Sequence, residues 1–222
     1  MPPEYHQYAL TLRERQEEYA DVSTFSFAAE EPIPFHAGQY GHLRVPNVPE
    51  GEKAVREFSF ANAPGDPDLL FTVNTRSGSG YQHALMAMRP GDVATLFKIK
   101  GELSLPEEGE TVMVAQGVGM APFRSLIRSR APSYPASAIS LIHVGRGDFL
   151  YDRELSTLPY VRIKTTREDL PHALVEAARA HAAARFLVAG APAFVDGVTE
   201  SLLREGVPIG AIIADRFKGL EE

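Results

Sequence analysis

The stretch Val112-Met113-Val114-Ala115-Gln116-Gly117-Val118-Gly119-Met120-Ala121-Pro122-Phe123 decides how this chain is interpreted. A run of strand-forming residues ends in two closely spaced glycines, and apolar residues at helical spacing follow at once. This order predicts a strand, a tight turn and the start of a helix. The first N–H groups of a helix lack partners and attract anions, and glycine lets a ligand approach the backbone closely. The stretch therefore predicts a phosphate-binding turn, although many α/β proteins have such a turn without a ligand.

Composition excludes several classes of function. A chain of 222 residues with 44% apolar residues can form one large domain or two small ones. The net charge of −7 argues against a nucleic-acid partner. The absence of cysteine excludes disulfides and any iron–sulfur cluster held by cysteines of this chain, and it fits the cytoplasm, which is the expected location. The scattered histidines predict no metal site.

No targeting or membrane segment is expected either. The start, MPPEYHQYAL, lacks the basic and apolar regions of a signal peptide. No apolar run approaches the roughly 18 residues that a membrane-spanning helix needs.

The first half of the chain reads as β structure. Strands are predicted over residues 8–12, 22–27, 38–45, 57–62, 69–74 and 93–99. We expect a charged turn at Arg13–Glu18 and a short helix over Tyr81–Met88, capped by Ser77 or Ser79. Many short strands with regular turn signals predict a small antiparallel β-barrel of the Greek-key type.

The second half alternates between strands and helices. Strands are predicted over residues 111–115, 138–144, 160–165, 185–189 and 209–213, and helices over 121–130, 152–158, 170–180 and 192–205. This pattern predicts an α/β domain with a parallel sheet, whose ligands bind at the carboxyl ends of the strands. The polar joint Leu105–Glu110 separates the halves, so the predicted domains are 1–106 and 107–222.

This order of domains resembles the ferredoxin–NADP⁺ reductase family over nearly the whole chain. The flavin motif of that family is similar to Arg56-Glu57-Phe58-Ser59, and its flavin-phosphate turn to Ser77–Tyr81 before Arg89-Pro90-Gly91-Asp92. Its nucleotide loop is similar to Gly117–Pro122, and its Cys-Gly-x-Pro segment to Val188-Ala189-Gly190-Ala191-Pro192. The closing Asp215–Leu220 resembles the usual ending of the family.

The resemblance implies that the first domain binds FAD, with FMN less expected. Arg56 would neutralise a flavin phosphate through its planar guanidinium. Phe58 would stack on the isoalloxazine ring, and Ser59 would act as a catalytic residue whose hydroxyl bonds the N5 region. The alternative is an ordinary strand with one buried Phe.

A second group would hold the flavin phosphates at the start of the short helix. It comprises Arg76 and the backbone of Ser77, Gly78, Ser79, Gly80 and Tyr81. Tyr81 stands where the family often has Ser, so its ring offers stacking on an adenine as an alternative. A plain Gly/Ser loop with a helix cap is the competing interpretation.

The resemblance implies that the second domain binds NADPH or NADH as a substrate. The expected binding residues are Gly117, Val118, Gly119, Pro122 and Gly190. Three positions depart from the family: Gln116 replaces Gly, Val118 replaces Thr or Ser, and Ala189 replaces Cys.

Three arginines of the second half are candidates for setting the choice between NADPH and NADH. Arg146, just after the strand 140–144, is expected to pair with the 2′-phosphate and to favour NADPH. Arg153 and Arg124 are weaker candidates for the same role, and a solvated loop arginine is the alternative.

Phe217 is expected to cover the flavin or nicotinamide as a second catalytic residue, or else to plug the core.

The implied function is hydride transfer from NAD(P)H to bound FAD and electron transfer onward. Acceptors are a ferredoxin, a flavodoxin, a monooxygenase component or a small molecule. Rivals are a flavin or ferric reductase and a non-catalytic flavin-binding subunit.

Overall fold

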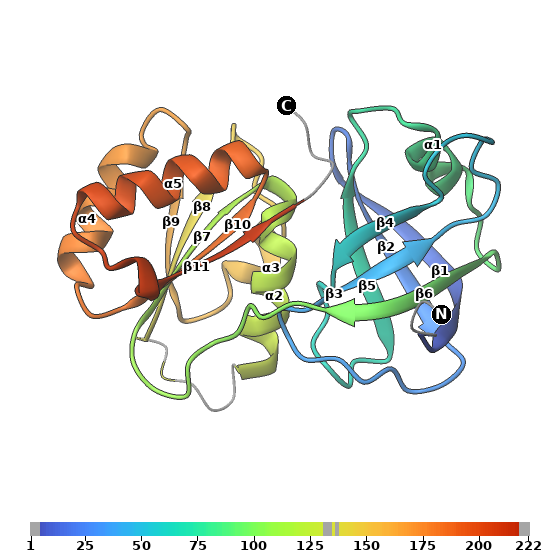
Figure 1. The fold of residues 1–222 in the computed structure, drawn as a ribbon, viewed down its shortest axis with the longest axis horizontal. Coiled ribbons are helices and arrows are strands. Elements are labelled where there is room, and N and C mark those ends of the chain that lie inside the picture. Colours follow the sequence, from blue (N-terminus) through green and yellow to red (C-terminus); the bar gives the residue numbers. More distant parts are fainter. Residues whose placement is uncertain (1–4, 131–134, 136–137, 218–222) are drawn as a thin grey trace. The chain divides into compact units, whose positions relative to one another are not determined.

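The computed structural model describes residues 5–130, 135 and 138–217 (Figure 1). The chain divides into two compact units, Met1–Glu102 and Leu103–Glu222. Within the described residues, no helix has the length and apolar character needed to cross a membrane.

The first unit is an antiparallel, barrel-like sheet with one helix, as the sequence predicts. Its six strands pair in the order β4-β3-β6-β1-β2-β5, which is not their order in the chain. The elements are β1 (Gln7–Tyr19), β2 (Val22–Ala29), β3 (Tyr40–Arg44), β4 (Val55–Ser59), β5 (Asp68–Asn74), α1 (Gly80–Ala87) and β6 (Val93–Lys100).

The prediction of a charged turn at Arg13–Glu18 is wrong. These residues continue β1 and pair with β2, with Arg15 opposite Phe25 and Glu17 opposite Ser23. The chain turns after Tyr19, where Asp21 has a left-handed φ of 64°. The charged side chains, except half-buried Glu18, are exposed on a strand whose backbone bonds are made by β2, so local polarity did not prevent pairing.

Alternating side chains of the first unit form its core. Leu10, Phe25, Leu43 and Leu96 are at most 1% exposed and pack with residues of α1. Burial of each such side chain contributes about 1.5–3 kcal/mol. The helix is therefore held against the barrel, which sets the position of its N-terminus.

The second unit has a five-stranded parallel sheet in the order β11-β10-β7-β8-β9. The strands are β7 (Thr111–Gln116), β8 (Ile139–Val144), β9 (Val161–Thr165), β10 (Arg185–Gly190) and β11 (Ile212–Arg216). The helices are η1 (Gly117–Gly119), α2 (Met120–Arg130), α3 (Asp152–Leu155), α4 (Leu170–Ala180), α5 (Pro192–Arg204) and η3 (Ile209–Ala211). The α/β prediction is confirmed.

Within the second unit, two boundaries differ from the prediction by three residues. The last strand begins at Ile212, because Ile209–Ala211 forms a 3₁₀ turn first, and the helix expected over 152–158 ends at Leu155.

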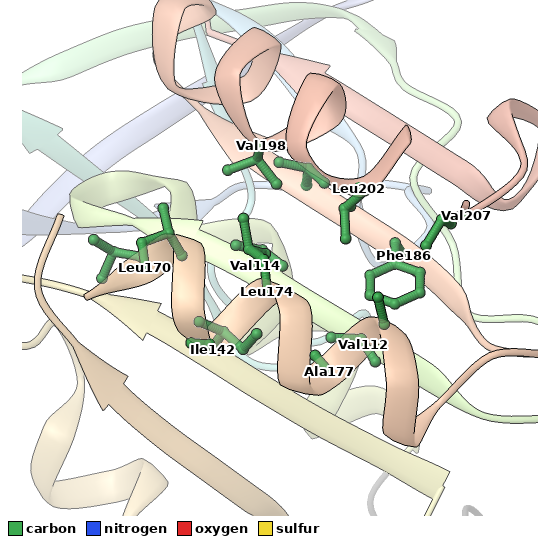
Figure 2. Close-up of a cluster of buried hydrophobic side chains, with 14 of the residues drawn as sticks. Val112, Val114, Ile142, Leu170, Leu174, Ala177, Phe186, Val198, Leu202 and Val207 are labelled. Carbon is green, nitrogen blue, oxygen red and sulfur yellow. The ribbon is translucent and has the colours of Figure 1, made fainter. Parts of the chain in front are cut away.

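One face of the parallel sheet packs against α4 and α5 (Figure 2). Val112, Val114 and Ile142 project from the strands toward Leu174 of α4 and Leu202 of α5. Both helices carry apolar residues at intervals of three or four, which place them on one face.

Candidate functional site

The candidate nucleotide site lies where the strand order of the second unit reverses. β7 has β8 on one side and β10 on the other, because the chain moves outward from β7 through β8 and β9 and then returns to the other side of β7 at β10. Parallel sheets bind ligands outside the carboxyl ends of their strands at such a point. The segments that follow β7 and β10 are Gly117–Gly119 and Ala191-Pro192, which are the two nucleotide motifs predicted from the sequence.

Gly119 joins these two motifs. A Cβ atom on Gly119 would contact the carbonyl oxygen of Ala189, lie 2.8 Å from the carbonyl carbon of Ala189 and lie 3.1 Å from Cα of Gly190. The space that this glycine leaves is therefore filled by the backbone of β10. Gly117 has a left-handed φ of 53°, which glycine adopts without strain.

Two helices begin at this edge. The start of α2 contains buried Pro122, preceded by the buried Val118 in η1, and α5 begins with Pro192. Proline suits the first turn of a helix because no N–H bond is lost there. The first N–H groups of a helix have no partner within the helix and favour an anion, although at α2 the N–H of Met120 donates to the carbonyls of Gly117 and Val118.

Phe217 is tied to the same edge. Its N–H donates to the carbonyl of Gly190 at 2.9 Å, and its side chain is half-buried and outside the core cluster of this unit. The position disfavours the core-plug alternative. Residues 218–222, which include the end of the closing motif, lie outside the described residues.

The arginines of this unit differ in their exposure and in whether they form ion pairs. Arg146 is exposed just beyond β8 and makes no ion pair with any other described residue. Arg124 is 11% exposed, donates to Glu154 at 2.7 Å and lies over the Tyr151 ring, so it is not available for a phosphate. Arg153 on α3 is exposed.

Arg167 was missed in the sequence. It follows β9 at the same edge, and its Nη2 donates to Oε1 of Gln116 at 3.0 Å. Its place just after a predicted strand, which matches that of Arg146, is the signal that could have found it.

His143 is the residue before the last one of β8 and lies close to the same edge of the sheet. It is 1% exposed, its Nδ1 has no hydrogen-bond partner among the described residues, and the Phe149 ring meets it edge-on at 5.2 Å. Burial, followed by nearby Arg162, lowers its pKa to about 4. The side chain is therefore neutral near pH 7.

The candidate flavin residues lie in the first unit. Phe58 is half-buried and packs against Phe71 and Tyr81, with ring centroids 6.3 and 5.9 Å away, so only part of its ring is open to a ligand. Ser59 is 8% exposed, and its hydroxyl makes no hydrogen bond to another described residue. Arg56 lies with its Cζ 5.5 Å from the centre of the Tyr81 ring.

The start of α1 holds an anion of the protein itself. Ser79 caps the helix by accepting from the N–H of Gln82, and the N–H of Gly80 donates to the Glu52 carboxylate at 2.7 Å. A Cβ atom on Gly80 would overlap that carboxylate. We call the space around the Gly80 N–H the cradle. Because it already holds a carboxylate, it fits an anion, as it must if a flavin phosphate is to bind there. Sequence reasoning missed Glu52, since no pattern connects it to Gly80, 28 residues away.

The remaining residues of this turn behave differently. Tyr81 is fully buried and its hydroxyl donates to the carbonyl of Leu43, so the alternative of stacking on an adenine is wrong for its ring. Burial raises the pKa of Tyr81 far above its usual value. Arg76 is exposed and 3.6 Å from Asp21, Ser77 donates to Gln82, and Gly78 has a left-handed φ of 60°.

The sequence matches no model of a known protein family. It is 31% identical to the flavodoxin/ferredoxin–NADP reductase of Escherichia coli over 143 residues, which cover 62% of this chain and 55% of that reductase. It is 26% identical to the flavohemoprotein of Bacillus subtilis over 151 residues, which cover 64% of this chain and 36% of that protein. The match thus spans about half of the reductase.

Solved structures have the same fold. A ferredoxin NADP⁺ reductase from Neisseria gonorrhoeae with bound FAD and NADP aligns with a TM-score of 0.81 at 20% identity, covering 95% of this chain and 98% of that one. A cytochrome P450 reductase from Amycolatopsis aligns with a TM-score of 0.81 at 21% identity, covering 96% and 70%. Over the matched residues the chain is similar in sequence to flavodoxin/ferredoxin–NADP reductase, and it has the fold of these solved structures. The resemblance and the fold class inferred from the sequence are confirmed.

Proposed function

We propose that the chain is a flavoprotein reductase that binds FAD in its first unit and transfers a hydride from NAD(P)H to it. One observation carries the flavin assignment. The N–H of Gly80 already holds a carboxylate, in a cradle with no room for a Cβ atom. Arg56 is near the same turn, and among the described residues it has no carboxylate partner.

The residues of the first unit would hold FAD by its two ends. The phosphates would bind the N–H groups of Ser79 and Gly80 and the guanidinium of Arg56, where helix start and cation act together. The open part of the Phe58 ring would contact the isoalloxazine, and the free hydroxyl of Ser59 would bond near N5. When bound, FAD supplies the redox chemistry by accepting a hydride and passing electrons onward.

The second unit would bind the nucleotide substrate. The starts of α2 and α5 would take its pyrophosphate, because both helices begin at the strand-order reversal. Arg146, exposed and without an ion pair in the described chain, would take a 2′-phosphate and favour NADPH over NADH. Phe217, bonded to Gly190, would lie near the nicotinamide.

A protein carrier is the acceptor that we favour. The relatives named above include a flavodoxin/ferredoxin–NADP reductase and a cytochrome P450 reductase. A carrier such as a ferredoxin, a flavodoxin or a monooxygenase component fits this group. Docking between charged proteins weakens as salt rises, so reduction of a carrier should slow with ionic strength, whereas reduction of a neutral quinone should not.

An anaerobic titration tests the central proposal. Protein loaded with FAD is mixed with NADPH or NADH, and the flavin absorbance band is followed. We expect the band to bleach. Retention of the band with both nucleotides would exclude the reductase function, and failure to take up FAD would exclude the flavin assignment.

A non-catalytic flavin-binding subunit is the second candidate. Val118 and Ala189 are both buried and apolar, so neither offers a polar group for a nicotinamide. Binding of FAD without bleaching by either nucleotide would favour this alternative.

A further inference from the structure

We infer that Glu52 sets the flavin affinity of this chain by occupying the phosphate cradle of α1 when no flavin is bound. The inference rests on the proposed function, since the competing anion is a flavin phosphate. It assigns to Glu52, in the loop between β3 and β4, a role as an internal competitor.

The contact at Gly80 is specific in its geometry. Oε2 of Glu52 lies 2.7 Å from the Gly80 nitrogen, a distance typical of a charge-assisted hydrogen bond. The carboxylate fills the volume that a side chain at position 80 would take, with its Cδ 2.6 Å from an ideal Cβ position. An anion of a ligand cannot occupy this volume while Glu52 does.

The Glu52 side chain can leave the cradle at Gly80. Its side chain is exposed, and the N–H of Gly80 is the hydrogen-bond partner that the structure gives to its carboxylate. A pocket of about 260 Å³ borders Gly80 and is lined also by Asn47, Pro49, His83, Ala84 and the acidic Asp92. Gly80 therefore borders open space beside α1.

Arg56 is the reason that a flavin phosphate can displace the Glu52 carboxylate from the cradle. Its guanidinium lies against the Tyr81 ring, one residue beyond Gly80, and forms no ion pair with Glu52 or any other described carboxylate. A flavin phosphate, with more charge and more acceptor oxygens than a carboxylate, can use both the helix start and this cation. Glu52 engages the helix start alone.

The consequence is a reduced apparent affinity. A ligand that binds only the open state loses affinity in proportion to the fraction of molecules in that state. A carboxylate at a helix N-terminus contributes roughly 0.3–1 kcal/mol, which corresponds to about two- to fivefold in a binding constant.

Flavin binding to the flavin-free protein tests this, measured by quenching of flavin fluorescence. Glu52→Gln removes the charge and Glu52→Ala removes the contact. We expect both variants to bind FAD more tightly than the wild type, by about two- to fivefold. Riboflavin, which has no phosphate, should bind all three proteins equally.

Two controls separate this role from others. Glu50→Gln removes the same charge two residues away, from an exposed side chain in the same loop, and should leave the FAD affinity unchanged. Gly80→Ala fills the cradle permanently and displaces only the end of a flexible side chain, so it should fold and bind FAD more weakly.

Several results would overturn the inference. Equal tightening in Glu50→Gln would show a general charge effect, and weaker FAD binding in both Glu52 variants would make Glu52 a flavin ligand. Unchanged FAD binding in Gly80→Ala would place the phosphate elsewhere. If wild type and variants all fail to bind FAD, the proposed function itself fails, whereas FAD binding that is identical in the wild type and the Glu52 variants rejects only the role of Glu52.

Discussion

Gly119 is the position at which one carbon atom decides whether two segments of the second unit can meet. The neighbours of its absent Cβ are backbone atoms of Ala189 and Gly190, which cannot rotate away as a side chain would. We expect Gly119→Ala to lower the free energy of unfolding by about 1–3 kcal/mol, as overpacking does.

Gly197→Ala is the matched control. Gly197 lies within α5 and no atom lies within 4 Å of its Cβ position, so alanine should stabilise the protein by roughly 0.5–1 kcal/mol. Urea denaturation followed by circular dichroism measures both variants. A Gly119→Ala protein as stable as the wild type would contradict the close approach to β10.

His143 makes the stability of the second unit depend on pH. Its pKa is lowered to about 4 in the folded chain by burial and by Arg162, from the ordinary histidine value of 6.5. Between these values the unfolded chain binds a proton that the folded chain does not, so stability is complete above pH 6.5 and falls as pH falls toward 4. The loss from pH 7.5 to 5 should be about 2 kcal/mol.

His143→Leu should remove this part of the pH dependence. Free energies of unfolding at pH 7.5 and 5 provide the comparison, with the exposed His172→Leu as a control that keeps the wild-type slope. An unchanged slope in His143→Leu would show that other groups dominate acid sensitivity.

At the scale of elements, α3 is held to β9 by charge. Asp152, in the first turn of α3, contacts Lys164 Nζ at 2.6 Å and Arg162 Nη2 at 2.6 Å. Hydrogen bonds from Lys164 and from Arg162 lower the pKa of Asp152, against the opposing effect of burial. This contribution is complete above the normal carboxyl pKa and is lost as pH falls below it.

Asp152→Asn should loosen α3 without unfolding the sheet. Because Asp152 is 42% exposed, water screens its pairs, and we expect a loss of no more than about 0.5–1 kcal/mol. Hydrogen exchange of the amides of residues 152–157 should accelerate, while that of β8 stays slow. Asp148→Asn, an exposed acid in the preceding loop, should change neither.

At the scale of the whole molecule, the two units should divide the two ligands between them. Loss of a charge-assisted contact costs about 1.5–3 kcal/mol, so Arg146→Ala should raise KM for NADPH about tenfold or more. KM for NADH and the Kd for FAD should stay within about twofold, because neither NADH nor FAD carries a 2′-phosphate.

Steady-state kinetics with both nucleotides and a flavin titration provide the measurements. Arg179→Ala is the control, since it removes the same charge from an exposed position near the end of α4. An equal effect of Arg146→Ala on NADPH and NADH would reject the role in nucleotide choice.

The sequence by itself determined the class of each half and the places of the nucleotide motifs, because these depend on the local period of apolar residues and on glycine and proline. Tertiary structure decided the rest. It placed Glu52 on Gly80, closed Gly119 against Ala189, buried the Tyr81 ring and extended β1 through Arg13–Glu18. Each of these contacts joins segments that are distant in the chain or depends on a partner strand. Such contacts leave no local pattern, so only the folded chain reveals them.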